Sequence, residues 1–169
     1  MCTDIIVYTD GSYIPEVKTD IGPVDTSSIC GCAYLIKTDH GLETKKFVIE
    51  SHSQRQILAE CWAVTEALEY LKTKIEKYKG RKIIVHADYV GAIFWADGTW
   101  KAGNIYTQEY VRKIRRLIFD LYAYDCEVTF QKVNGHSGNM YNDIVDESAR
   151  KAVENWAADH ALTDYNENA

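Results

Sequence analysis

An apolar segment near the start of the chain leads directly into a carboxylate. Ile5–Tyr8 is apolar and rich in β-branched residues, which predicts a buried strand. Asp10 follows where this strand ends, and Gly11 and Ser12 come directly after it. A buried carboxylate is costly, or becomes neutral, unless a cation or another partner compensates its charge. The sequence therefore predicts a polar site at the end of its first strand.

The composition is that of an ordinary globular protein. The chain has 169 residues, of which 46% are hydrophobic and 26% charged, and a chain of this size can bury a core of its own. We expect residues 1–169 to form a single domain. No apolar stretch has the length of a membrane span, and residues 1–4 do not resemble a signal peptide. A cytoplasmic location, without membrane contact and without an obligate protein partner, is the expectation.

The charge of the chain is unevenly distributed. The net charge of −6 argues against general binding to nucleic acid, because such binding depends on neutralising phosphates. However, Lys101 and the four basic residues of 112–116 lie within one short stretch. The net charge therefore weakens the hypothesis of a nucleic-acid partner but does not exclude it.

The cysteines do not indicate a metal site. Their number is five, so at least one thiol must stay unpaired in any disulfide scheme. Cys30 and Cys32 alternate within the strand-like run Ile29–Ile36, and no second pair lies at zinc-site spacing. Packing in the core is the favoured interpretation.

The periodicity of apolar residues predicts an α/β fold. Hairpin strands followed by alternating helices and strands, in the order β-β-β-α-β-α-α-β-α, imply a mixed sheet flanked by helices. Long polar loops are expected over 13–28, 97–104 and 134–140. The strands are expected over 5–8, 32–37, 46–50, 83–87 and 127–133, and the helices over 56–78, 92–96, 107–124 and 141–160.

Three further acids occupy unusual positions. Asp88 ends the strand 83–87, Glu60 lies on the apolar face of the helix 56–78, and Asp146 lies among apolar residues of the closing helix. Each acid alone is explained by a turn, a helix start or a solvated face. Together with Asp10 they predict a cluster of oxygen ligands, which suits Mg²⁺ or Mn²⁺. Two such ions about 4 Å apart would make a site that cleaves phosphodiesters.

One histidine has a context that requires explanation. His136 is flanked by glycines in the loop 134–140, ten residues before Asp146. Its pKa range suits proton transfer, so it is a candidate to assist water or product release.

Five motifs occur in order along nearly the whole chain: YTDGS (8–12), AECWAVTEAL (59–68), VHAD (85–88), GHSGNMYND (135–143) and VDESARKA (145–152). With these motifs the chain resembles ribonuclease H of type 1. The resemblance implies a ribonuclease H-like fold with a five-stranded mixed sheet, and hydrolysis of the RNA strand of RNA–DNA hybrids. The products would carry 5′-phosphate and 3′-hydroxyl ends, and the 2′-hydroxyl would distinguish RNA from DNA.

The same resemblance implies roles for individual residues. The four acids Asp10, Glu60, Asp88 and Asp146 would bind two Mg²⁺ ions, with Mn²⁺ as an alternative. His136 would be the general base or the release residue. Substrate contacts would come from Gly11, Ser12, Gln56, Trp100, Lys101 and Asn142.

The chain departs from the family pattern in its substrate-binding segments. Tyr89 follows Asp88 where many relatives have serine, which puts a phosphate contact in doubt, and Ile57 cannot form the hydrogen bond expected at its position. The basic handle of many bacterial members is reduced to WADGTWKAGN (95–104), a form similar to the module found with viroplasmin-type hybrid-binding domains. Trp100 and Lys101 could stack on sugar and hold a DNA phosphate, or simply pack a short loop.

Two other functions compete with this one. A transposase, integrase or junction resolvase would share strand-end acids, but the GHSG motif together with a helix-borne Glu60 is not expected there. A catalytically inactive domain that binds hybrids would show loss of at least one acid, and all four are present.

Overall fold

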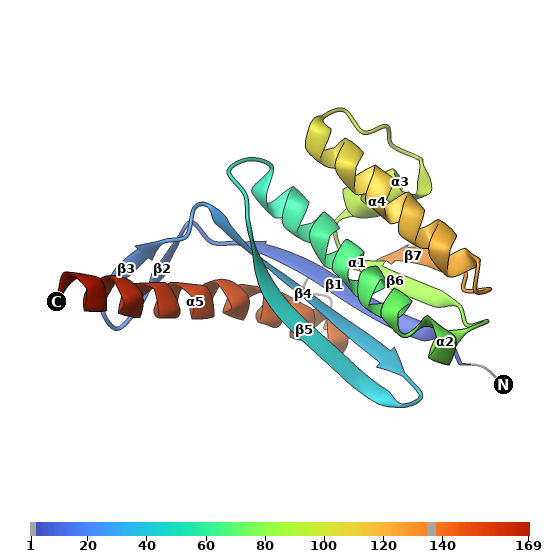
Figure 1. Cartoon of the computed structure of the whole chain (residues 1–169), viewed down its shortest axis with the longest axis horizontal. Helices are drawn as coiled ribbons and strands as arrows, with labels where there is room; N and C mark the ends of the chain where they lie inside the picture. Colours follow the sequence, from blue (N-terminus) through green and yellow to red (C-terminus); the bar gives the residue numbers. More distant parts are fainter. Residues whose placement is uncertain (1–2, 135–137) are drawn as a thin grey trace.

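The chain folds into a five-stranded sheet with helices on both faces (Figure 1). The computed structural model describes residues 3–134 and 138–169. The main sheet contains β1 (Ile5–Tyr13), β4 (Ile29–Thr38), β5 (Gly41–Glu50), β6 (Ile83–Ala87) and β7 (Val128–Lys132), and a small second sheet contains β2 (Glu16–Lys18) and β3 (Pro23–Asp25). The helices are α1 (Arg55–Thr73), α2 (Ile75–Tyr78), α3 (Val90–Asp97), α4 (Ile105–Tyr122) and α5 (Met140–Asn168).

The central strand β1 has a different kind of neighbour on each side. In the strand order β5-β4-β1-β6-β7, β1 is antiparallel to β4 and parallel to β6, which confirms the predicted mixed sheet. The parallel pairing ends at Tyr8 and His86, whereas the antiparallel pairing continues to Tyr13. Asp10 therefore lies beyond the last pair with β6 while its backbone is still held by β4.

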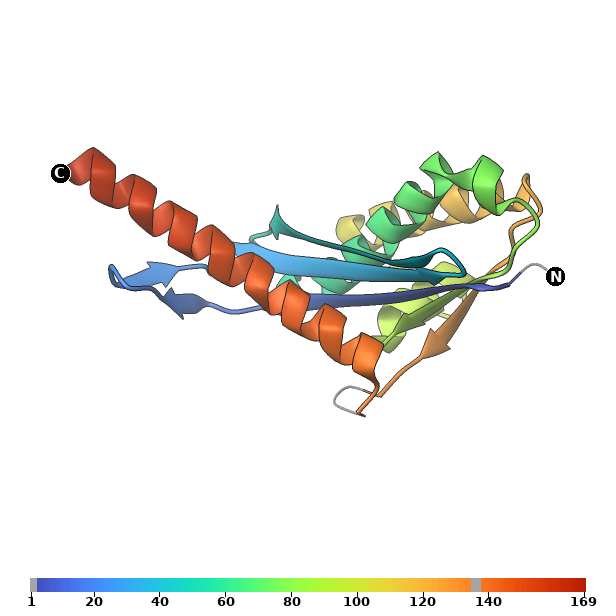
Figure 2. The same cartoon turned by 90° about the horizontal axis from the view of Figure 1, so that it is seen from below.

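The alternation of side chains along β1 divides the core into two layers. Val7 belongs to the larger cluster, in which α1 and α4 cover one face of the sheet with residues such as Leu68 and Ile114. Tyr8 packs with Val145 of α5 in a second cluster, and α5 lies along the other face of the sheet (Figure 2). Leu68 and Ile114 are fully buried, and each such side chain contributes about 2 kcal/mol.

The strands are longer than the sequence predicts. The expected end of the first strand at Asp10 is wrong, because pairing with β4 holds the backbone of β1 as far as Tyr13. The second and third strands form one long hairpin about the predicted turn at 39–41, since every residue from 29 to 38 finds a partner in β5. Apolar patterns miss such residues because much of β5 is exposed.

The polar loop 13–28 and the end of the last helix form a joint unit that was not predicted. The loop contains the hairpin β2–β3, and α5 extends to Asn168 rather than ending near 160. Val24 of β3 packs against Ala157 and Ala161 of α5, which gives these helical turns a partner. Nevertheless, within 3–134 and 138–169 no helix is long and apolar enough to cross a membrane.

The helix predicted over 56–78 is interrupted. α1 ends at Thr73, and Lys74, with φ −111° and ψ 13°, separates it from the short α2. The predicted element order therefore holds for the main sheet and its larger helices, but it omits α2 and the hairpin β2–β3.

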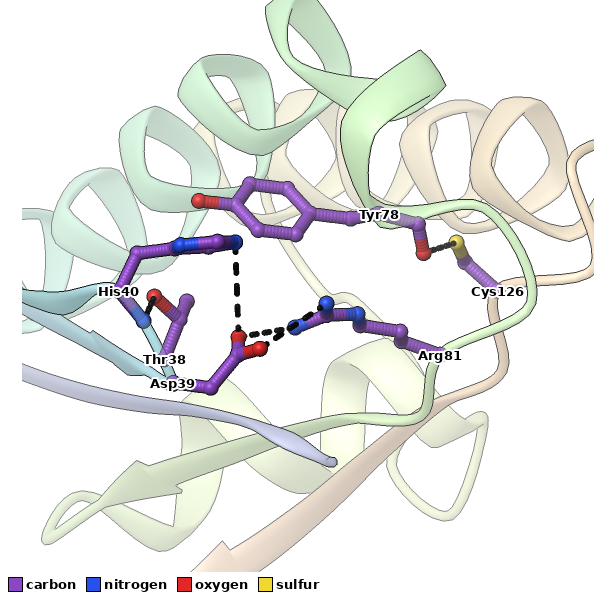
Figure 3. A network of polar contacts seen from close by, with 6 residues as sticks. All are labelled: Thr38, Asp39, His40, Tyr78, Arg81 and Cys126. Carbon is purple, nitrogen blue, oxygen red and sulfur yellow. Dashed lines mark hydrogen bonds and ion pairs between the residues drawn. The ribbon is translucent and has the colours of Figure 1, made fainter. Parts of the chain in front are cut away.

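A polar network, shown in Figure 3, lies at the β4–β5 turn, at the end of the sheet where β1 begins. Arg81 contacts Asp39 in the β4–β5 turn, with Nη1 2.6 Å from Oδ1, and its guanidinium lies 5.4 Å from the centre of the Tyr78 ring. Cys126 donates through its thiol to the Tyr78 carbonyl at 3.3 Å. These contacts join the hairpin turn to the segment after α2.

Candidate active site

Gly11 allows β1 and α1 to approach closely. A Cβ atom at this position would lie 2.5 Å from the Glu60 nitrogen and 2.6 Å from the Ala59 carbonyl carbon. A side chain would therefore push the helix away from the strand. The Gly11 N–H also donates to Asp10 Oδ1 at 2.9 Å. The glycine predicted as a substrate contact thus has a packing role that places Glu60 beside Asp10.

Three of the four predicted acids converge. Asp10 comes from β1, Glu60 from the second turn of α1, and Asp88 from the residue after β6. Each offers a carboxylate oxygen, and these oxygens all lie within 4.8 Å of one another. Asp10 and Glu60 are only 4% and 3% exposed, and Asp88 is half-buried. Within the described residues, this is the group of acids, histidines and cysteines that could hold a metal ion.

Burial and mutual repulsion change the titration of this cluster. Burial, with the charge of Asp88 beside it, raises the pKa of Asp10 from 3.8 to about 7. Burial also raises the pKa of Glu60 well above its ordinary value, and the Asp10 and Asp88 carboxylates raise it further. Burial also raises the pKa of Asp88, whereas the charge of Lys132 lowers it. Such a cluster disfavours its own ionisation, which a cation would reverse.

The donor set fits a hard divalent cation. All three groups are carboxylates, the ligands that Mg²⁺ and Mn²⁺ prefer. Glu60 Oε2 is buried and has no hydrogen-bond partner. A buried polar atom of this kind normally has one, so its position requires an explanation. Cation binding by Asp10, Glu60 and Asp88 would supply it.

Asp146 lies beside the cluster but outside it. It belongs to α5, and its side chain is 35% exposed. Its charge contributes to the raised pKa of both Asp10 and Asp88, which places it near them. Its Oδ2 lies 3.8 Å from Nε of Arg150, one helical turn later. Sequence reasoning missed Arg150, although the spacing of four residues is the signal that would have found it.

The start of α5 is fixed by an asparagine that sequence reasoning also missed. Asn139 Oδ1 accepts hydrogen bonds from the N–H groups of Tyr141 and Asn142, at 3.0 and 3.2 Å. Asparagine before a helix is a recognised start signal. Asn142 itself is 2% exposed, and its Oδ1 lacks a hydrogen-bond partner. His136 lies outside the described residues, so its expected position stays a prediction.

Trp100 and Lys101, the predicted substrate contacts in the loop 97–104, differ in what they contact. Trp100 is 40% exposed, and its ring packs edge-on against Phe94 and Trp95, which supports the packing interpretation without removing the other. Lys101 is exposed and lines a groove with Arg112 and Arg115 of α4.

The two predicted contacts near the cluster differ in exposure. Gln56 is exposed in the first turn of α1, and Ser12 is half-buried in β1. These positions do not test whether Gln56 and Ser12 contact a substrate, so both contacts stay predictions.

The four cysteines within the described part of the chain are core residues. Cys30, Cys32, Cys61 and Cys126 are free and buried. Burial raises the pKa of the Cys30 thiol to about 11, so the thiolate that zinc requires is disfavoured. Packing is confirmed as the role of Cys30 and Cys32, which share a cluster with Ala59 and Ala63.

Comparison with known proteins gives a consistent result. The family model described as RNase H matches residues 2–154. A ribonuclease H of Chlorobium phaeobacteroides is 31% identical over 154 residues, covering 89% of this chain and 96% of that protein. A ribonuclease H of Clostridium botulinum is 28% identical, covering 90% and 97%.

Solved structures show the same fold. LC11-RNase H1, in a crystal structure with an RNA/DNA hybrid, superposes with a TM-score of 0.67 at 20% identity, covering 89% of this chain and 99% of that one. RNase H1 of the archaeon Halobacterium salinarum superposes with a TM-score of 0.66 at 15% identity, covering 90% and 98%. At these identities the likeness concerns the fold.

Proposed function

We propose, since the chain belongs to the ribonuclease H family, that it is an endonuclease hydrolysing the RNA strand of RNA–DNA hybrids. The observation that carries this proposal is the meeting of Asp10, Glu60 and Asp88 from three separate elements. Their shared geometry has no structural benefit without a cation, because clustered buried carboxylates destabilise the fold. The free cysteines agree with a reducing compartment, as expected for a cytoplasmic enzyme.

The residues divide the work of the reaction. Asp10, Glu60, Asp88 and Asp146 would hold two divalent cations, Mg²⁺ or Mn²⁺. When bound, such ions supply an activated water and a stabilised leaving oxygen. Gly11 keeps Glu60 against Asp10, and Asn139 fixes the start of the helix that carries Asp146. His136 would move a proton or release product, leaving 5′-phosphate and 3′-hydroxyl ends.

The acidic net charge does not oppose a nucleic-acid substrate, because it is confined to one part of the molecule. Residues 14–28 and 154–169 together contain seven acidic side chains and one lysine, which leaves eighteen of each sign on the rest. This acidic unit comprises the hairpin β2–β3 and the last turns of α5, and it lies away from α3 and α4 (Figure 1). The remaining surface is neutral overall, with the Lys101 groove as a local basic region.

The reaction class is tested by cleavage of end-labelled nucleic acids. The chain is incubated with RNA–DNA hybrid, double-stranded RNA and double-stranded DNA, with Mg²⁺ or with EDTA. We expect Mg²⁺-dependent cleavage of the RNA strand of the hybrid alone. Cleavage of DNA would indicate a resolvase or transposase, and binding of hybrid without cleavage would indicate an inactive binding domain.

Removal of His136 is expected to slow the reaction without abolishing it. His136→Ala should lower kcat by about a hundredfold, which is the lower end of what general acid–base assistance contributes. Single-turnover and steady-state rates on hybrid distinguish a chemical role from a role in release. His160→Ala, on the acidic unit, is the control and should behave as wild type. A loss as complete as that of an acid variant would mean that His136 has a more central role.

Removal of Lys101 is expected to weaken substrate binding only. Lys101→Ala should raise KM a few-fold with kcat unchanged, and it should reduce the slope of log affinity against log salt by about 1. Lys18→Ala removes the same charge from the acidic unit and should change neither quantity. An unchanged salt slope for Lys101→Ala would show that this side chain does not contact a phosphate.

A further inference from the structure

The fourth acid is held differently from the other three. Asp10, Glu60 and Asp88 each offer an oxygen to one compact group, and within the described residues that group does not include Asp146. Its side chain is 35% exposed, in contrast to the nearly complete burial of Asp10 and Glu60. Asp146 is nevertheless close enough for its charge to act on Asp10 and Asp88. It lies at the edge of the cluster rather than in it.

The neighbour of Asp146 on its exposed side is a guanidinium. Arg150 Nε lies 3.8 Å from Asp146 Oδ2, and the Arg150 side chain is 51% exposed. Both residues line one hollow on the outer side of α5, together with Gly138, Asp143 and Glu147. Asp146 thus stands between a positive side chain and a negative cluster.

Arg150 and a cation bound at the cluster would act on the same carboxylate, that of Asp146, in opposite ways. The Asp146 carboxylate beside Arg150 lies outside the compact group, so it must leave this contact to ligate a cation held by that group. The positive charges of the guanidinium and the cation also repel each other. While no cation is bound, the Arg150 contact instead compensates the Asp146 charge and limits repulsion with Asp10 and Asp88.

We propose that Arg150 is a positioning residue that holds Asp146 at the edge of the cluster and competes with a divalent cation for its carboxylate. The inference rests on the proposed function only in taking Asp146 as a cation ligand. Arg150 would then weaken cation binding and stabilise the cation-free chain. The concentration of Mg²⁺ at which the site fills would depend on a residue that is not itself a ligand.

The test measures cation binding directly. Mg²⁺ and Mn²⁺ are titrated calorimetrically into the full chain without nucleic acid, and thermal unfolding is followed in EDTA. Arg150→Met keeps the apolar stem and removes the charge. We expect cation affinity to rise about two- to fivefold, the equivalent of a partly exposed ion pair. The Tm in EDTA should fall, and Arg150→Lys, which keeps the charge, should lie nearer to wild type in both measurements.

Two further variants separate the specific contact from general electrostatics. Lys151→Ala removes the same charge one residue away, where the lysine pairs with Glu147 at 2.9 Å, and should leave cation affinity nearly unchanged. In an Asp146→Asn background, Arg150→Met should have no further effect on affinity. The inference would be overturned if Arg150→Met and Lys151→Ala changed cation affinity equally. It would also be overturned if Arg150→Met still changed affinity in the Asp146→Asn background, or if Arg150→Met weakened cation binding. These titrations contain no nucleic acid, so they stay valid if the chain does not cleave hybrid. If the chain cleaves hybrid but Arg150→Met does not change cation affinity, only the inference about Arg150 is refuted.

Discussion

Asp10→Asn is expected to abolish cleavage and to make the cation-free chain more stable. Asp10 is buried within the cluster, and the substitution removes one of its three carboxylates. Metal-ion stabilisation is worth several kcal/mol, and each 1.36 kcal/mol is tenfold in rate. We therefore expect kcat on RNA–DNA hybrid to fall by at least about a thousandfold at saturating Mg²⁺.

The stability of the same variant should depend on pH in a defined direction. Burial raises the pKa of Asp10 in the folded chain from 3.8 to about 7. Below pH 4 the carboxyl is protonated in both states, so wild type and variant should be equally stable. Between pH 4 and 7 only the unfolded chain ionises, and wild type loses stability that the variant keeps. In EDTA at pH 8 the variant should be more stable by up to about 4 kcal/mol.

Denaturant unfolding in EDTA, at pH 4 and pH 8, measures this difference, and added Mg²⁺ should reduce it by stabilising wild type. Asp4→Asn, at an exposed position before β1, is the matched control and should change neither rate nor stability. Full activity of Asp10→Asn would refute the assignment of the site. A variant less stable than wild type at pH 8 would show that another group, rather than a cation, compensates Asp10.

The acids of the cluster could be predicted because local patterns in the sequence mark their positions. Asp88 follows an apolar strand, and Glu60 interrupts the apolar face of a helix, so both are recognisable without knowing their neighbours. The position of Asp10 within its strand could not be predicted in this way. Its backbone pairs with Ala33 of β4, which lies far along the chain, and apolar periodicity contains no information on such pairing.

Other features depend on contacts that only the folded chain provides. The last turns of α5 are largely exposed, and the contact of Ala157 and Ala161 with Val24 is what supports them. The sequence indicates helix propensity there but not the partner. In contrast, the contact of Asp146 with Arg150 is local and could have been inferred from spacing. The expected role of His136 stays a prediction, since it lies outside the described residues.

Gly11→Ala is expected to damage both the fold and the reaction, through a single added carbon. The new Cβ would lie 2.5 Å from the Glu60 nitrogen and 2.6 Å from the Ala59 carbonyl carbon, which are backbone atoms that cannot rotate away. α1 must therefore move from β1 and take the Glu60 carboxylate with it. Overpacking of this kind costs about 3 kcal/mol. A displacement of the order of 1 Å at a reacting site costs about a hundredfold in rate.

We expect the free energy of unfolding to fall by about 3 kcal/mol in denaturant titrations, and kcat of the folded fraction to fall by about tenfold to a hundredfold. Gly103→Ala is the matched control, because a Cβ there meets nothing within 4 Å, and it should be neutral or slightly stabilising. Ala59→Gly should rescue little, since the closest atoms are backbone rather than the Ala59 side chain. A Gly11→Ala chain with wild-type stability and weaker hybrid binding alone would instead favour the substrate contact that the sequence motif predicts.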